Sequence, residues 1–333
     1  MNFHSASVWD APSAFGYDDI ALVPRVVSGL AHRTDANVSV RAGILDLNTP
    51  IVSSPMPDVT GLKMMQALAE HRTLALLHRF QTIEDQVDDW DGAFLASRVG
   101  VLGAAIGVTG DWRERSQMLY EHGCRIFCLD TANGAHQQVG KVLEFMRNKY
   151  NDAFLMAGNV ASAEAFSWLE NAGADAIRVG IAGGAVCETR VETAVYVPTA
   201  YSVAEAASVR RTALIIGDGG VRTPADMCKL LALGADLVML GSALAGASEA
   251  PGPVVVYENE KYKLMRGAAS FGVQHDAGNE RPEYVEGRET LAKYKGSVVN
   301  ILNRYVAGLR SSMSYMNART LQEYREHATF VRL

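Results

Sequence analysis

Eight short apolar runs, separated by stretches of helical periodicity, restrict the fold more than any other feature of the 333-residue chain. Each run has the length of a buried strand and ends near Gly, Ser, Asp or Asn. The runs are Ile51–Ser54, Leu74–Leu77, Val99–Ile106, Ile126–Asp130, Phe154–Gly158, Ala176–Gly180, Ala213–Gly217 and Leu237–Gly241. Eight strand–helix units in series predict an α/β protein built as a single closed parallel (β/α)8 barrel, the TIM-barrel architecture.

An open doubly wound sheet is the alternative architecture. It would more usually show about five or six strands and a Gly-x-Gly-x-x-Gly sequence after the first, and the chain has neither. We therefore expect one barrel domain over residues 1–333, with an N-terminal preamble over 1–50 and an insertion after the eighth strand over 242–297. The insertion contains a Val-rich hairpin candidate, and a final helix is expected over about 296–309. Long insertions in compact domains are often lids, although a disordered surface excursion is also consistent with the sequence.

Charge and hydropathy exclude several classes of function. The formal net charge is −6, which gives no reason to expect nucleic-acid binding, and no run reaches the roughly 20 apolar residues of a membrane helix. The N-terminus shows no secretory pattern, and four cysteines are too few for a disulfide framework, so we expect a cytoplasmic protein. Cys124 and Cys128 are expected in a buried strand, because a zinc site would need two further ligands nearby.

The stretch from Val179 to Arg190 delivers one cysteine after three glycines. Glycines allow the backbone to approach a ligand closely, and Cys187 follows them, flanked by Glu188, Thr189 and Arg190. Arg190 would lower the thiol pKa from its reference of roughly 8.5, which favours a nucleophile. A small buried apolar residue is the other common fate of a free cysteine. The local sequence supports both interpretations equally.

Polar residues follow most of the predicted strands, where the loops of such barrels build active sites. They are Ser54, Asp58, Asp130, Asn133, Asn159, Cys187, Asp218 and Ser242. Two glycine motifs, Gly217-Asp218-Gly219-Gly220 and Gly241-Ser242, follow the last two strands and predict a phosphate site made from backbone N–H groups. The Asp218 carboxylate would repel a phosphate, so we expect it to bind sugar hydroxyls. A simple turn is the alternative for either glycine motif.

These motifs together resemble the IMP dehydrogenase/GMP reductase family along nearly the whole chain. The matching segments are Tyr17-Asp18-Asp19, Ser54-Pro55-Met56, Ala157-Gly158-Asn159-Val160, the Cys187 loop, Gly217-Asp218-Gly219-Gly220, Val238-Met239-Leu240-Gly241-Ser242 and Leu309-Arg310-Ser311-Ser312-Met313-Ser314-Tyr315. Any one of them would be a weak signal, whereas their common order is specific.

The resemblance implies that Cys187 attacks C2 of a purine nucleotide to form a covalent thioimidate, with hydride exchanged with a nicotinamide cofactor. Thr189 would assist proton handling. The substrate side would comprise Ser54, Asp218, Gly219, Gly220, Gly241, Ser242, Arg266 and Gly267. The cofactor side would comprise Asp130, Asn133, Gly134 and Asn159. The carbonyls of Ala182, Gly184 and Cys187 match those that hold a monovalent cation, K+, in some members, and the family suggests a homotetramer.

Within the family, the sequence favours a GMP reductase, which converts GMP to IMP and ammonia with NADPH. The spacing between the second and third strands leaves no room for the CBS domains usual in IMP dehydrogenases, and no Arg-Tyr dipeptide of their mobile flap occurs between Ser270 and Gly296. Asp130-Thr131-Ala132-Asn133-Gly134 is similar to the reductase Asp-x-Ala-Asn-Gly. The spacing from Glu283 to Gly296 is also reductase-like.

Departures from the family pattern concentrate at the expected substrate contacts. Ala185 and Met265 replace a phosphate-binding Ser and Tyr, for which Arg266 or Arg190 would have to compensate. The other departures are Pro57 for Asp, Glu188 for Thr, Ala268-Ala269 in the turn near the base, and Leu291 at the position of the reductase's catalytic Glu, which leaves Glu289 as the nearby candidate. A paralogue acting on a modified or deoxy purine nucleotide, a minimal IMP dehydrogenase and a non-catalytic nucleotide-binding subunit therefore remain alternatives.

Overall fold

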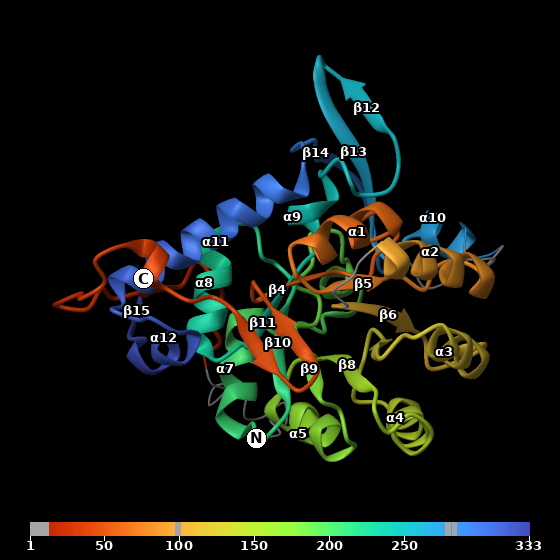
Figure 1. Cartoon of the computed structure of the whole chain (residues 1–333), viewed down its shortest axis with the longest axis horizontal. Helices are drawn as coiled ribbons and strands as arrows, with labels where there is room; N and C mark the ends of the chain where they lie inside the picture. The colour runs from red at the N-terminus through yellow and green to blue at the C-terminus, as the bar shows by residue number, and fades with distance from the viewer. Residues whose placement is uncertain (1–12, 97–100, 277–280, 282–284) are drawn as a thin grey trace.

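The computed structural model describes residues 13–96, 101–276, 281 and 285–333. Eight parallel strands form one sheet in the order β4-β11-β10-β9-β8-β7-β6-β5. A parallel bridge between Val52 and Leu74 joins β4 to β5, and the Ser53 amide donates to the Leu74 carbonyl at 3.0 Å. The predicted parallel barrel is confirmed (Figure 1). Val99 and Gly100, at the start of the third predicted strand, lie outside the described residues.

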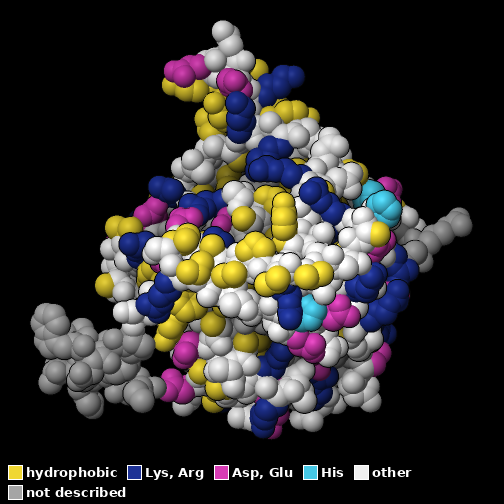
Figure 2. Space-filling model, turned by 90° about the vertical axis from the view of Figure 1, so that its left-hand side faces the viewer, with side chains coloured by type: hydrophobic (Ala, Val, Ile, Leu, Met, Phe, Trp, Pro, Cys, Tyr) yellow, Lys and Arg dark blue, Asp and Glu magenta, His cyan; other side chains and the backbone are white. Residues whose placement is uncertain are grey.

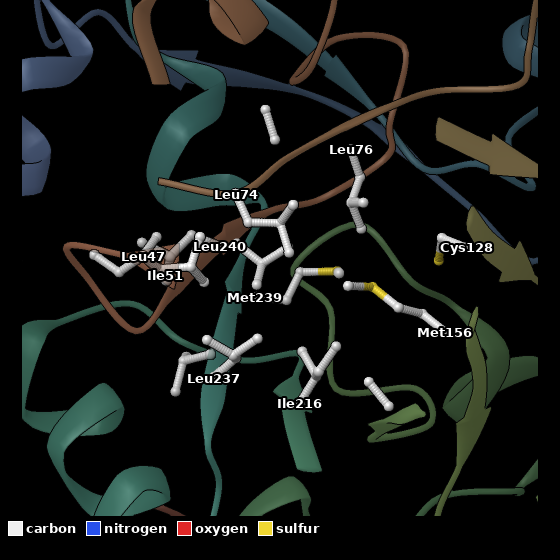
Figure 3. Packing of buried hydrophobic residues seen from close by; sticks show 14 of the residues in the cluster. Leu47, Ile51, Leu74, Leu76, Cys128, Met156, Ile216, Leu237, Met239 and Leu240 are labelled. Carbon is white, nitrogen blue, oxygen red and sulfur yellow. The ribbon is translucent and has the colours of Figure 1, made fainter. Parts of the chain in front are cut away.

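The barrel strands coincide with the predicted apolar runs. They are β4 (Ile51–Ser53), β5 (Ala75–Leu77), β6 (Leu102–Ile106), β7 (Ile126–Asp130), β8 (Phe154–Val160), β9 (Ala176–Val179), β10 (Leu214–Asp218) and β11 (Leu237–Leu240). Strands covered by helices bury both faces, which explains runs without polar alternation. Figure 3 shows side chains from several strands gathered in the interior, including Ile51, Met156, Ile216 and Met239, and all four are buried.

Among the described residues, eight helices of 9 to 18 residues cover the barrel. They are α1 (Leu62–Glu70), α2 (Ile83–Ala96), α3 (Trp112–Glu121), α4 (Gln137–Lys149), α5 (Ala163–Asn171), α7 (Thr199–Val209), α8 (Pro224–Leu233) and α11 (Val298–Tyr315). Helix α8 shows why the sequence sets such boundaries: Thr223 and Asp226 form a capping box, Pro224 is the first helical residue, and Gly234 ends the helix in the left-handed conformation. Helix α11 extends to Tyr315, beyond the predicted end at Leu309.

Smaller elements surround this core. Strands β1 (Ile20–Leu22) and β15 (Phe330–Arg332) pair antiparallel, as do β2 (Val40–Ala42) and β3 (Leu45–Leu47). Short helices lie at Arg33–Asp35 (η2), Thr189–Thr193 (α6) and Leu321–His327 (α12).

The segment after β11 carries its own antiparallel sheet. It contains α9 (Ser242–Ala245), β12 (Val254–Tyr257), β13 (Glu260–Arg266), α10 (Phe271–Asp276) and β14 (Glu289–Lys293). The predicted Val-rich hairpin is confirmed as β12 paired with β13, and β14 pairs with β13 on the other side. The hairpin projects from the barrel in Figure 1, and Figure 2 shows hydrophobic beside charged side chains on it. The division into preamble, barrel and insertion stays a prediction.

Candidate active site

A cavity of about 290 Å³ opens at the carboxyl ends of the barrel strands. Its walls come from the loops after β4, β5, β7, β9 and β10 and from two segments of the insertion, Gly267–Ala269 and Glu286–Gly287. Cys187 and Thr189 both line it. The cavity therefore lies at the end of the barrel where parallel strands direct their loops into a common site.

Gly180 fixes the path of the cysteine loop. A Cβ at this position would lie 1.9 Å from the Asp218 carbonyl oxygen, and φ of Gly180 is +139°, so only glycine fits. The Gly180 amide donates to the Val160 carbonyl, and farther on the Cys187 amide donates to the Gly184 carbonyl at 3.2 Å. The loop thus crosses the end of β10 closely and presents Cys187 to the cavity.

Thr189 connects the Cys187 thiol to a carboxylate. The thiol donates to Thr189 Oγ1 at 3.3 Å, and the Thr189 hydroxyl donates to Glu286 Oε2 at 2.6 Å. All three residues line the cavity. The second distance is typical of a charge-assisted O–H···O⁻ bond. The arrangement connects a thiol to a carboxylate through a hydroxyl group, the geometry that a nucleophile and its base require.

Backbone pairing holds Glu286 in this position. The Glu188 amide donates to the Glu286 carbonyl at 2.7 Å, and the Arg288 amide donates to the Val186 carbonyl at 3.0 Å. Gly287 lies between these bonds, opposite Cys187, where a Cβ would be 2.6 Å from the Ser270 amide nitrogen. The insertion therefore docks against the cysteine loop through the backbone.

Sequence reasoning missed Glu286 and selected Glu289. The structure places Glu289 at the start of β14, outside the cavity lining, with its carboxylate accepting from the Gly272 amide at 3.2 Å. The two glutamates are three positions apart in the sequence, and only the pairing of 186–188 with 286–288 shows which one reaches Thr189. The glycine after Glu286 is the one sequence signal that could have favoured it, because close backbone pairing requires a small residue there.

Arg178 of β9 was also not predicted, yet it joins the two sides of the cavity floor. Its Nη1 lies 2.7 Å from Asp130 Oδ1, and its Nη2 lies 2.9 Å from Asp218 Oδ2. Burial by itself raises the pKa of Asp130, but the Arg178 and Arg79 guanidinium groups outweigh it and hold that pKa below its ordinary value. One buried cation therefore contacts both carboxylates and favours the charged form of Asp130.

The contacts to Asp218 all end on one oxygen. Oδ2 accepts from Arg178 Nε at 3.1 Å, from Arg178 Nη2 at 2.9 Å and from Asn159 Nδ2 at 2.8 Å. Within the described chain, no hydrogen bond ends on Oδ1. This asymmetry leaves one carboxylate oxygen available to a ligand hydroxyl in the cavity.

The other predicted site residues divide into two groups. Ser54, Asp130, Asn159, Ala182, Gly184, Asp218, Gly219 and Gly267 line the cavity with Cys187 and Thr189. Asn133, Gly134, Gly220, Gly241, Ser242, Arg266 and Glu289 are not among its lining residues. Gly220 adjoins Gly219, and a Cβ on Gly241 would lie 3.6 Å from Ser54, so these two glycines border the cavity.

The remaining residues of the second group are engaged elsewhere. Asn133 Oδ1 accepts from the Ala135 amide at 3.1 Å, and the Gly134 amide donates to the Asn159 carbonyl at 2.7 Å. The Ser242 carbonyl accepts from Lys295 Nζ at 3.1 Å. Gly134 packs against Gly158 and Asn159, where a Cβ would meet backbone at 2.9 Å. Asn133 and Gly134 therefore shape the loop after β7.

Arg266, one candidate to replace the missing phosphate donors, is held by two carboxylates. Its guanidinium donates through Nε and Nη2 to buried Asp58 at 2.9 Å each, and through Nη1 to Asp276 at 2.7 Å. The hydrogen bond to Asp58 is the main reason that the pKa of Arg266 is raised. Arg190, the other candidate, lies with its guanidinium carbon 4.7 Å from the centre of the Tyr196 ring.

Cys187 differs from the other three cysteines in exposure. Cys124, Cys128 and Cys228 are buried, and burial raises the pKa of their thiols to about 12, 11 and 11. Cys187 is only half-buried. Among the free thiols, it is therefore the one that a ligand in the cavity can reach.

No helix in the part of the chain that the structure describes is long and apolar enough to span a membrane.

Comparison with known proteins agrees with the geometry. The family model described as "IMP dehydrogenase / GMP reductase domain" matches residues 14–333. The inosine-5'-monophosphate dehydrogenase of Aquifex aeolicus is 39% identical over 245 residues, which cover 70% of this chain and 49% of that protein. That of Bacillus subtilis is also 39% identical over 245 residues, with 70% and 50% covered. The chain thus spans about half the length of the curated relatives it matches. The family model matches nearly the whole chain, and the cavity of the barrel contains the cysteine loop. The chain therefore belongs to the IMP dehydrogenase/GMP reductase family.

Proposed function

We propose that the protein is an NADPH-dependent GMP reductase that deaminates GMP to IMP. The observation that carries the proposal is the chain of contacts from Cys187 through Thr189 to Glu286. Reductive deamination needs a nucleophile at C2 and a group that returns a proton to the leaving amine, and this relay supplies both. The overall reaction consumes GMP, NADPH and two protons and yields IMP, NADP+ and ammonium.

The relay acts in two directions. As Cys187 Sγ bonds to C2, the thiol proton passes through the Thr189 hydroxyl to the Glu286 carboxylate. The same route returns a proton to the amino group on C2, which leaves as ammonia and generates the thioimidate. NADPH, when bound, supplies the hydride that C2 then receives. Cleavage of the C2–S bond releases IMP and restores the Cys187 thiolate.

Other residues orient the nucleotide. Asp218 Oδ1 accepts from the ribose hydroxyls, because Oδ2 is occupied by Arg178 and Asn159. The amides of Gly220, Gly241 and Ser242 bind the phosphate. These assignments agree with a nucleotide whose base lies over Cys187 and whose ribose lies over the end of β10.

The cofactor fits the opposite side of the barrel mouth. In the strand order, β5 lies across the barrel from β9, and β7 lies across from β11. The cavity wall after β5 and β7 offers the Phe80 ring, with the Arg79 guanidinium 4.6 Å from its centre, and the polar groups of Asp130 and Thr131. An aromatic face beside polar groups suits a nicotinamide riboside. These residues would hold the cofactor at the mouth of the cavity.

The carbonyls of Ala182, Gly184 and Cys187 would hold a K+ ion. Ala182 has φ of +60°, a left-handed conformation that bends the loop as a cation cradle requires, although the Gly184 carbonyl already accepts from the Cys187 amide. A homotetramer in the cytoplasm, and a lid role for residues 242–297, complete the proposal.

A modified or deoxy purine nucleotide is the second candidate substrate. Met265, in place of a phosphate-binding tyrosine, is buried, and Ala268 and Ala269 line the cavity near the base. Two absent hydroxyl donors would each weaken phosphate binding by on the order of 1 to 3 kcal/mol. Because the relatives are named inosine-5'-monophosphate dehydrogenases, oxidation of IMP is also a candidate reaction. A protein that binds nucleotide without turnover is the remaining alternative.

The test measures absorbance of NADPH at about 340 nm with GMP, dGMP and other guanine nucleotides, and NADH formation from IMP. We expect oxidation of NADPH with GMP, its loss in Cys187→Ala, and its retention in Cys228→Ala, a matched control because Cys228 is buried in α8. Full activity of Cys187→Ala would refute the covalent mechanism. Silence with GMP but turnover of another nucleotide would select the second candidate.

A further inference from the structure

The motif Tyr17-Asp18-Asp19, in the N-terminal preamble, takes no part in the chemistry above. Its Tyr17 side chain is buried, and the hydroxyl donates to the Gly219 carbonyl at 2.7 Å, across 202 residues of sequence. Gly219 lines the cavity, in the loop between β10 and α8. The N-terminal segment therefore contacts the loop to which the phosphate is assigned.

Further contacts fix Tyr17 against this loop. Lys229 Nζ of α8 donates to the Tyr17 carbonyl at 2.6 Å, and Asp18 pairs with Arg222 at 3.1 Å. A Cβ on Gly220 would lie 3.0 Å from Cε2 of the Tyr17 ring. Tyr17 is thus held from α8 and fits under Gly220, so its hydroxyl has a fixed position relative to the loop.

The position of the hydroxyl determines which way the next amide points. In a trans peptide, the carbonyl of one residue and the N–H of the next point in opposite directions. Because the Gly219 carbonyl is directed at Tyr17, the Gly220 N–H is directed away from it. Within the described chain, this N–H donates no backbone hydrogen bond. At φ of +106° and +76°, Gly219 and Gly220 would otherwise allow several orientations of the peptide.

We propose that Tyr17 is a positioning residue that orients the Gly220 amide toward the nucleotide's phosphate. The inference rests on the proposed function, which assigns the phosphate to this loop. Tyr17 is not among the residues that line the cavity, so its contribution should depend on the phosphate of the ligand. The hydrogen bond to the Gly219 carbonyl thereby holds this backbone donor in one orientation.

The experiment compares GMP with guanosine in the wild type, Tyr17→Phe and Tyr324→Phe. Tyr324 is a matched control, because its buried hydroxyl contacts Ser312 and the Cys228 carbonyl behind α8, remote from the cavity lining. For Tyr17→Phe, we expect KM for GMP to rise about 3- to 10-fold, the effect of one lost hydrogen bond. The kcat with GMP, and kcat/KM with guanosine, should change less than about 2-fold. Calorimetric binding of both ligands gives the same comparison without turnover.

The outcomes separate this inference from the function on which it rests. If the wild type binds guanosine as tightly as GMP, the assigned phosphate site is wrong. If the wild type prefers GMP and Tyr17→Phe keeps the full preference, or loses affinity for both ligands equally, the role of Tyr17 is refuted. Should Tyr17→Phe fail to fold, Lys229→Met removes the anchor of the Tyr17 backbone and should reduce the preference for GMP in the same direction.

Discussion

Replacement of Glu286 by Gln tests the relay most directly. The carboxamide keeps the size of the side chain and an oxygen that accepts from Thr189, but it cannot take a proton. The Thr189–Glu286 distance of 2.6 Å shows that the carboxylate is already in hydrogen-bonding contact. General acid–base catalysis contributes about 10²- to 10⁴-fold, so we expect kcat with GMP to fall by at least about 10²-fold, or roughly 3 kcal/mol in the barrier. KM for GMP should change less than about 3-fold, because Glu286 handles protons and is not assigned to nucleotide binding.

Three further variants make the assay decisive. Thr189→Val interrupts the same relay, so the double variant with Glu286→Gln should be no slower than the slower single variant. Glu289→Gln changes the other candidate glutamate, whose carboxylate contacts the Gly272 amide. Steady-state oxidation of NADPH with GMP measures all four proteins. The reasoning fails if Glu286→Gln keeps kcat within about 3-fold of wild type, or if Glu289→Gln causes the larger loss.

Three other predictions concern stability, measured by urea unfolding. Gly180→Ala should lower the free energy of unfolding by at least about 2 kcal/mol, because its Cβ would lie 1.9 Å from a carbonyl oxygen. Gly110→Ala, also at positive φ but with no atom within 4 Å, should lower it by about 1 kcal/mol. Equal losses would contradict the steric argument. Arg178→Met removes the buried cation shared by the partly buried Asp130 and Asp218, and Arg79 then remains beside Asp130 alone. The free energy of unfolding should fall by about 3 kcal/mol, and less in Arg178→Lys. A loss below about 1 kcal/mol would be inconsistent with the observed pairing. Burial raises the pKa of Glu170, but backbone amides of Ala213 and Thr212 and the Arg211 side chain lower it to about 2, below its ordinary 4.5. Its stabilisation, on the order of 3 kcal/mol, is therefore present above pH 4.5 and is lost as the pH falls toward 2, and Glu170→Gln should flatten that part of the profile.

The barrel was predictable from local sequence because each buried strand leaves a continuous apolar run. Residues of β5 and β6, for example, are buried along their whole length, so their runs contain no polar alternation that would obscure them. Helix ends such as the capping box from Thr223 to Asp226 are also recognisable in the sequence, because the residues of a cap lie within one turn of each other. The insertion was less predictable, because the pairing of β14 with β13 depends on contacts between segments more than 20 residues apart.

The candidate site divides in the same way. The sequence by itself determined that Cys187 and Thr189 follow a glycine loop at a strand end, because loop, glycines and nucleophile are neighbours in the chain. Only the tertiary structure decided that Glu286, and not Glu289, reaches Thr189, that Arg178 joins Asp130 to Asp218, and that Tyr17 holds Gly219. Each of these contacts joins residues between 40 and 202 positions apart. Barrel closure and the backbone pairing of the insertion decide which residues meet in these contacts. No local pattern of residue types specifies which charged or hydroxyl groups are brought together over such distances in the sequence.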